Sequence, residues 1–254
     1  MGKNHIRLET EQQKGIYERF RYLADRFGRW EVWADFITMS ACCLCPNNRQ
    51  DHEQEYASIA QKYRPEEVRR FTEMFALTVE ALERNPDQDF LGDLFMRFDL
   101  GNTWKGQFFT PYNVCQCIAS LTAGDLKGQL ERQTWISVND PAVGAGALLI
   151  AFAQECLRQK VNYQTDVLFI GQDVDRTAAM MCFVQLSLLG CAGYIIVRDS
   201  LLNPAVGPSV LLPVSREGQE IWFTPMFCMD TWQLRRAVEQ IKYLGEPIRE
   251  EATE

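Results

Sequence analysis

Short apolar segments alternate with amphipathic ones in the second half of the chain, and this alternation constrains the fold more than any other feature. Strands that are separated by helices pair in parallel, and the helices then cover both faces of the sheet. We therefore predict an α/β fold with a doubly wound sheet. The expected strands are 135–138, 166–170, 194–197, 210–214 and 220–223, and the expected helices are 112–121, 145–159, 175–189 and 230–243. The segment 210–214 is a weaker strand candidate because Pro213 lies inside it.

The first hundred residues carry helical periodicity alone, with apolar and aromatic residues recurring at steps of three and four. We expect helices at 15–38, 49–63, 65–84 and 90–98. The chain then divides into a helical N-terminal region at 1–104, an α/β core at 105–245 and an acidic tail at 246–254, whose composition is typical of disorder.

The charge and the cysteine content bound the function. A net charge of −8 argues against a protein that grips nucleic acid by bulk electrostatics, so we expect this chain alone to bind DNA weakly. Nine cysteines are scattered through apolar runs, as is typical of reduced packing residues. With no signal sequence and no apolar run of membrane-spanning length, we expect a cytoplasmic protein without a membrane partner.

The turn after the first predicted strand is the main candidate for a ligand site. It consists of Asp140, Pro141, Ala142, Val143, Gly144, Ala145 and Gly146, and it opens a helix. Its glycines allow the backbone to approach a ligand, and the free N–H groups at the helix start suit a carboxylate. Asp140 could accept a hydrogen bond from an ammonium group. An ordinary strand-to-helix turn is the alternative.

Two further acids stand at the ends of the next two strands. Asp173, with Val174 beside it, ends the second strand, where an acid usually accepts from ribose hydroxyls. Asp199 ends the third strand and could accept from an adenine amino group. Asp175 is better explained as the N-cap of the following helix. The sequence therefore predicts a nucleoside-containing cofactor at the carboxyl edge of the sheet.

A segment upstream of the first strand, Gly106-Gln107-Phe108-Phe109-Thr110-Pro111, completes a pattern that resembles the N6-adenine DNA methyltransferases, specifically the modification subunits of type I restriction systems. The resemblance covers roughly residues 90 to 227. It implies a class I methyltransferase (Rossmann-like) core, S-adenosylmethionine as cofactor and DNA as substrate. It also implies that Phe108, Thr110 and Pro111 line the methionine end of the cofactor.

The same resemblance directs attention to the catalytic residues. The family carries an Asn-Pro-Pro-Tyr/Phe tetrapeptide after the fourth strand, where polar oxygens accept from the adenine amino group and the aromatic ring stacks on the extruded base. The nearest segment here is Thr224-Pro225-Met226-Phe227, so Thr224, Pro225 and Phe227 are the candidates. About thirty residues follow it, so we expect a truncated core that a specificity or completing subunit supplements.

Three functions remain open at this point. The chain is an adenine-N6 DNA methyltransferase, or a catalytically degenerate relative that binds the cofactor as a sensor or assembly subunit, or a structural partner with a vestigial turn. No metal is expected. The run Cys42-Cys43-Leu44-Cys45 with His52 lacks the paired Cys-x-x-Cys spacing of structural zinc sites, which favours packing roles for these cysteines.

Overall fold

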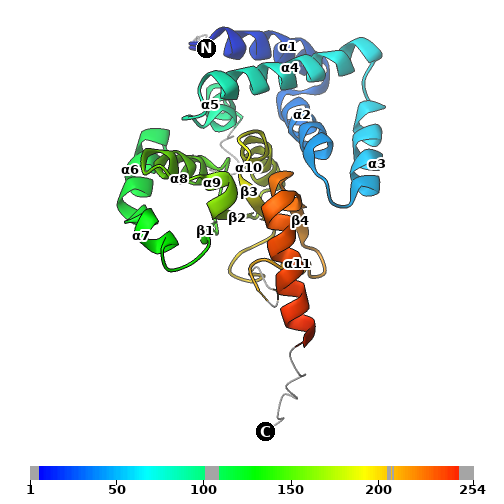
Figure 1. Ribbon diagram of the computed structural model, residues 1–254. Helices are drawn as coiled ribbons and strands as arrows, with labels where there is room; N and C mark the ends of the chain where they lie inside the picture. The colour runs from blue at the N-terminus through cyan, green and yellow to red at the C-terminus, as the bar shows by residue number, and fades with distance from the viewer. Residues whose placement is uncertain (1–5, 101–108, 205–206, 208, 246–254) are drawn as a thin grey trace.

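The computed structural model describes residues 6–100, 109–204, 207 and 209–245. The N-terminal region is helical, as predicted, and α1 and α4 lie side by side across the top of Figure 1. Its helices are α1 (Glu11–Phe27), α2 (Arg29–Leu44), α3 (Arg49–Ala60), α4 (Pro65–Arg84) and α5 (Phe90–Arg97).

The single helix expected at 15–38 is wrong, because two helices meet there at a glycine. Gly28 has a φ of 86° and ends α1 while it precedes α2. Glycine adopts this backbone conformation without strain, whereas other residues do not, so the chain can change direction at Gly28. The apolar periodicity of the sequence continues across this break. At the other end, Thr10 and Gln13 form a capping box that starts α1 earlier than the periodicity indicated.

The second part of the chain alternates strands and helices. Its first elements are α6 (Tyr112–Ala123), α7 (Leu126–Leu130), β1 (Ile136–Asp140), α8 (Ala147–Arg158), α9 (Tyr163–Asp166) and β2 (Val167–Asp173). Next come α10 (Arg176–Leu188), β3 (Ala192–Val197), β4 (Glu220–Phe223), the 3-10 helix η1 (Met226–Cys228) and α11 (Asp230–Gly245). The strand expected at 210–214 is wrong, since this segment forms a turn and a bend followed by irregular backbone at Pro213.

The sheet has the order β1-β2-β3-β4. The first three strands are parallel, with Asp140 opposite Gly171 and Asp173 opposite Val197, so their carboxyl ends form one edge. β4 runs antiparallel to β3, and its last residue, Phe223, pairs with Tyr194 near the amino end of β3. The end of β4 therefore lies at the edge opposite to the carboxyl ends of the parallel strands.

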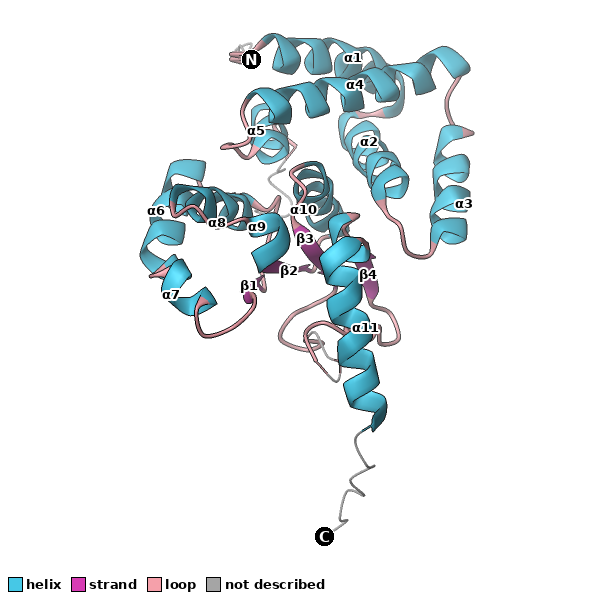
Figure 2. Cartoon of the chain, in the orientation of Figure 1, coloured by secondary structure: helices cyan, strands magenta, loops and turns pink. Residues whose placement is uncertain are grey.

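Helices cover both faces of the sheet, which confirms the α/β architecture (Figure 2). Alternate side chains of β2 pack on opposite faces of the sheet. Phe169 belongs to the large core shared with α8 and α10, whereas Leu168 and Ile170 pack in a smaller core with Phe227 and Trp232 near α11. Among the described residues, the strands lie in the sheet in the same order as in the chain, so each strand is added on the same side of the one before it. β1 has no described strand on its outer side.

The large core is continuous from the helical region into the sheet. It includes Phe20 and Trp33 from the first helices as well as Phe183 and Trp222 from the α/β part, and α10 packs directly on α2. The division predicted between residues 104 and 105 falls outside the described residues, so it stays a prediction. Of the helices that the structure describes, none has the length and apolar character needed to cross a membrane.

Candidate functional site

The glycine turn between β1 and α8 is built around two positive φ angles. Gly144 has a φ of 54° and Gly146 one of 98°, and both are conformations that glycine adopts without strain. A side chain at Gly144 would place its Cβ 3.1 Å from the ring of Phe109. The turn is pinned to the sheet, because the Val143 amide donates to the carbonyl of Gln172 at 3.0 Å.

Asp173 ties the end of β2 to this turn. Its Oδ2 accepts a 2.8 Å hydrogen bond from the Gly144 amide, and its Oδ1 accepts one of 2.8 Å from the Asp175 amide. A carboxylate has about four lone-pair positions, so further donors can still be accepted. Val174, beside it, is 72% exposed. Asp175 caps α10 by accepting from the Ala178 amide at 3.0 Å, which confirms its predicted capping role.

A cavity of about 270 Å³ opens above the turn. It collects Thr110, Asp140, Ala142 and Gly144, all of which are predicted site residues, although Thr110 precedes the segment of the other three by thirty residues. The cavity is also lined by Asp89, Phe109, Cys115, Ile118, Val143, Ala145, Ala147 and Leu148. Pro111 precedes α6 next to Thr110, and Pro141 is exposed beside Asp140. Phe108 lies outside the described residues.

Asp89 is a site residue that the sequence analysis missed. It is 7% exposed and caps α5, where its Oδ1 accepts from the Gly92 amide at 3.0 Å and from Nε2 of Gln185 at 2.8 Å. Burial raises the pKa of this carboxyl group, although both hydrogen bonds oppose the shift. The only sequence signal for Asp89 is its capping position ahead of the predicted helix, which indicates local structure and no ligand.

Gln185 connects Asp89 to the glycine turn. It is fully buried on α10, and besides donating to Asp89 its Nε2 donates to the Ala145 carbonyl at 2.9 Å. Its Oε1 accepts from the Leu91 amide at 3.0 Å. One amide side chain therefore holds the start of α5 and the glycine turn at fixed positions on either side of the cavity.

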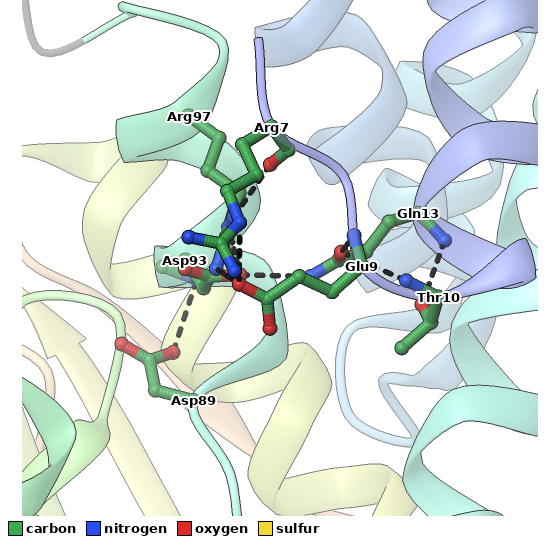
Figure 3. Close-up of polar contacts among 8 residues, drawn as sticks. Arg7, Glu9, Thr10, Gln13, Asp89, Asp93 and Arg97 are labelled. Atoms are coloured by element: carbon green, nitrogen blue, oxygen red, sulfur yellow. Dashed lines mark hydrogen bonds and ion pairs between the residues drawn. The ribbon is translucent and has the colours of Figure 1, made fainter.

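The other end of α5 is fastened to the beginning of the chain (Figure 3). Asp93 accepts from Nε2 of Gln13 at 2.8 Å and from Nε of Arg97 at 2.6 Å, and Arg97 also pairs with Glu9. In Figure 3 a dashed line joins Asp89 to the start of α5 next to Asp93, and the hydrogen bonds to the Asp89 carboxylate come from the Gly92 amide and Gln185. The helical region thus positions Asp89 at the cavity without neutralising it by any of these cations.

The cavity is acidic. Burial raises the pKa of Asp140; the hydrogen bond that it accepts from the Ala142 amide opposes this shift, and the charge of Asp173 adds to it. Half-buried Asp140 and buried Asp89 therefore face the same space, and the described residues that line it include no lysine or arginine. Such a site favours a positively charged ligand.

Asp199 follows the third strand at the same edge of the sheet. Its Oδ1 accepts from the amides of Leu201 and Leu202, at 2.8 and 3.0 Å. It does not line the cavity described above. The structure therefore places acids after all three parallel strands, as predicted, with Asp140 and Asp173 closest to the glycine turn.

The structure does not bring Thr224, Pro225 and Phe227 to this site. Thr224 is fully buried, and its hydroxyl donates to the Cys191 carbonyl at 2.7 Å and accepts from the Gly193 amide at 3.0 Å. Phe227 is fully buried in the smaller core. The predicted juxtaposition of these residues with the cofactor edge is wrong, because β4 joins the sheet antiparallel and ends at the amino end of β3.

Comparison with known proteins gives the family. A crystal structure from Listeria monocytogenes, assigned to the class I S-adenosylmethionine-dependent methyltransferases, matches at 18% identity with a TM-score of 0.43, over 79% of this chain and 57% of that one. The chain thus spans little more than half the length of that protein. No curated protein matches. Residues 88–251 match the model of the N-6 DNA methylase family, to which this chain therefore belongs.

Proposed function

We propose that the chain is the cofactor-binding core of an S-adenosylmethionine-dependent, adenine-N6-specific DNA methyltransferase. S-adenosylmethionine is the cofactor that the family implies. The observation that carries the proposal is the convergence of Asp140, Gly144 and Thr110 on one acidic cavity, together with the bond from Gly144 to Asp173. This cavity would take the methionine end of the cofactor, which carries an ammonium and a sulfonium group.

Each residue then has a specific task. The Asp140 carboxylate accepts from the cofactor ammonium, and Gly144 and Gly146 let the backbone approach the cofactor. The amides of the first turn of α8, at Ala147 and Leu148, face the methionine carboxylate. Asp173 accepts from the ribose hydroxyls through its remaining lone pairs, and the exposed Val174 offers apolar surface to the adenine ring. Asp199 accepts from the adenine amino group. Phe108, Thr110, Pro111, Pro141 and Ala142 complete the contacts by resemblance to the family.

Calorimetric titration with S-adenosylmethionine tests this assignment. Asp140→Asn keeps the shape of the side chain and removes its charge, so affinity should fall at least about tenfold, because a hydrogen bond to a charged group contributes roughly 1.5–3 kcal/mol. Glu131→Gln, an exposed acid next to α7, is the matched control and should leave affinity unchanged. Wild-type protein that binds no cofactor would refute the assignment.

Methyl transfer is a separate question from cofactor binding. Incubation of the protein with unmethylated DNA and methyl-labelled cofactor, followed by nucleoside analysis, should yield N6-methyladenine. The net charge of −8 predicts weak DNA binding that is lost steeply with salt, so the assay belongs at low ionic strength. Cofactor binding without label in any DNA would favour the second candidate below.

A catalytically degenerate cofactor-binding subunit is the second candidate, and the position of Thr224 favours it. Thr224, the first residue of the segment that corresponds to the family tetrapeptide, is buried away from the cavity. Among the described residues, the outer side of β1 has no neighbouring strand. Helix α11 also exposes an apolar stripe that includes Leu234, Ile241 and Leu244. A completing or specificity subunit that covers these surfaces would supply the base-binding residues, and mixing with it would be required for activity.

Three further assignments rest on the resemblance. We place the protein in a restriction-modification context, since the cofactor segments resemble those of type I modification subunits. We place it in the cytoplasm, which agrees with nine unpaired cysteines. We also retain the division into a helical region at 1–104, a core at 105–245 and a tail at 246–254. Limited proteolysis followed by mass analysis tests this division, which cleavage confined to α2 or α10 would contradict.

A further inference from the structure

Helices α2 and α3 form a hairpin whose connection lies near β4 (Figure 1). The end of α2 brings Cys42 to the inner face of α3, where His52 and Glu55 stand three residues apart on one side of the helix. One ligand atom from each of the three side chains lies within 4.8 Å of the others. In the sequence, His52 stands out with the cysteines as a candidate metal ligand, whereas Glu55 does not.

The distances suit a small cation. Sγ of Cys42 lies 3.7 Å from Oε2 of Glu55. Around a tetrahedral zinc ion, bonds of about 2.0–2.3 Å place neighbouring ligand atoms roughly 3–4 Å apart. The Cys42 and Glu55 atoms already have this separation, and the ligand nitrogen of His52 lies within 4.8 Å of both.

His52 has a polar atom that the described structure leaves unused. The residue is 8% exposed, and its Nε2 is buried without a hydrogen-bond partner among the described residues. The ring stacks on Trp222 with centroids 4.0 Å apart, so packing fixes its plane. A buried imidazole nitrogen without a partner costs free energy, which a bound cation would recover.

An arginine donates hydrogen bonds to the Glu55 carboxylate, as outer partners do for carboxylates that bind metal ions. Nη2 of Arg176 lies 3.0 Å from each of its oxygens, and Nε of Arg176 pairs with Glu220 on β4 at 2.9 Å. Hydrogen bonds from outside the ligand set orient a carboxylate toward the ion. The thiolate of Cys42 and the charge of Glu55 would together balance a divalent cation.

We propose that Cys42, His52 and Glu55 form a zinc site at the junction of α2, α3 and β4. A thiolate, an imidazole and a carboxylate are the donor set that zinc accepts, with a fourth position left for water or another ligand. Binding converts the Cys42 thiol to a thiolate and releases one proton to solvent. This site is independent of the cofactor cavity and joins the helical region to the last strand of the sheet.

The test is metal binding by the full-length protein without a histidine tag. Zinc content after dialysis should be one ion per chain, and cobalt substitution should give the intense visible absorption of a tetrahedral site with a thiolate charge-transfer band in the near ultraviolet. The cobalt spectrum identifies the ligand class without any substitution. A wild-type protein without stoichiometric zinc, or a cobalt spectrum of octahedral type without the thiolate band, would overturn the proposal.

Substitutions then identify the ligands. Cys42→Ser, His52→Ala and Glu55→Gln should each weaken zinc binding by more than the roughly 10–100-fold that loss of an outer partner costs. Cys117→Ser and Glu53→Gln, an exposed cysteine on α6 and an exposed neighbour on α3, should bind as the wild type does. Circular dichroism confirms that each variant is folded before titration. Wild-type affinity in folded Cys42→Ser would also overturn the assignment.

Discussion

The Gly144 amide donates a 2.8 Å hydrogen bond to the Asp173 carboxylate, which joins the turn after β1 to the end of β2. One proposed cofactor ligand therefore organises another. The residue that would accept from the ribose also fixes the backbone that would face the methionine carboxylate. Damage to either residue is expected to affect both halves of the cofactor.

Gly144→Ala should lower cofactor affinity more than it lowers stability. The new Cβ meets the Phe109 ring at 3.1 Å, and a positive φ costs about 1–2 kcal/mol for a residue with a side chain. Thermal unfolding and calorimetric titration separate the two effects. Gly28→Ala is the control, because Gly28 also has a positive φ but its added Cβ would meet nothing within 4 Å. Equal loss of affinity in both variants would contradict the prediction.

Cofactor affinity should decrease on acidification. Burial raises the pKa of Asp140, so its charge is lost at a higher pH than that of an ordinary aspartate. Affinity should be full above this pKa and fall as the pH drops through it. Stability has the opposite dependence: the buried charge costs free energy of folding above the folded-state pKa, and this cost disappears as the pH falls toward the unfolded value.

Titration of affinity from neutral to mildly acidic pH checks this prediction in the wild type and in Asp140→Asn. The variant should show a flatter profile, and what remains should come from other groups, among them Asp89, whose pKa burial also raises. Identical profiles in the two proteins would assign the dependence to those other groups instead.

Asp89→Asn should weaken cofactor binding by about tenfold, or roughly 1.4 kcal/mol, because it removes one of the two negative charges that face the cavity. It should at the same time stabilise the free protein at neutral pH, since burial disfavours the charged carboxylate. The two readouts thus move in opposite directions. Glu131→Gln, the exposed acid next to α7, again serves as the matched control and should leave affinity unchanged.

Thr224 is predicted to contribute to stability rather than to catalysis. Thr224→Val removes a hydroxyl that bonds to Cys191 and Gly193, which should destabilise the protein by about 1–3 kcal/mol because buried partners lose their hydrogen bonds. Thr224→Ser keeps the hydroxyl and should cost less. Neither should change cofactor affinity. Methyl transfer lost in both variants, with stability and affinity retained, would restore the catalytic assignment.

The sequence predicted the features that depend on neighbouring residues. The apolar runs of β1, β2 and β3, the glycine turn and the cap at Asp175 all follow from local patterns, and the structure confirms them. The break at Gly28 was missed because apolar periodicity continues through it.

Features that depend on distant residues were not predictable from the pattern. Nothing in the residues of β4 indicates that it pairs antiparallel with β3, and this pairing alone moves Thr224 away from the cavity. In the sequence alone, Asp89 has the pattern of a helix cap and Glu55 that of a surface acid. Only the packing of α5 and α3 on the remainder of the chain places Asp89 against Gln185 and Glu55 against Arg176.

The position of Gln185 has a practical consequence for dissecting the protein. Its side chain forms hydrogen bonds with Leu91, Asp89 and Ala145. Removal of the N-terminal helices through α5 would therefore leave this buried amide without two of its partners and would uncover a face of α10. A shortened version that begins at the family-like segment near residue 105 should be insoluble when expressed. One that begins just before Asp89 would keep the Gln185 bonds but would still uncover the face of α10 that packs on α2.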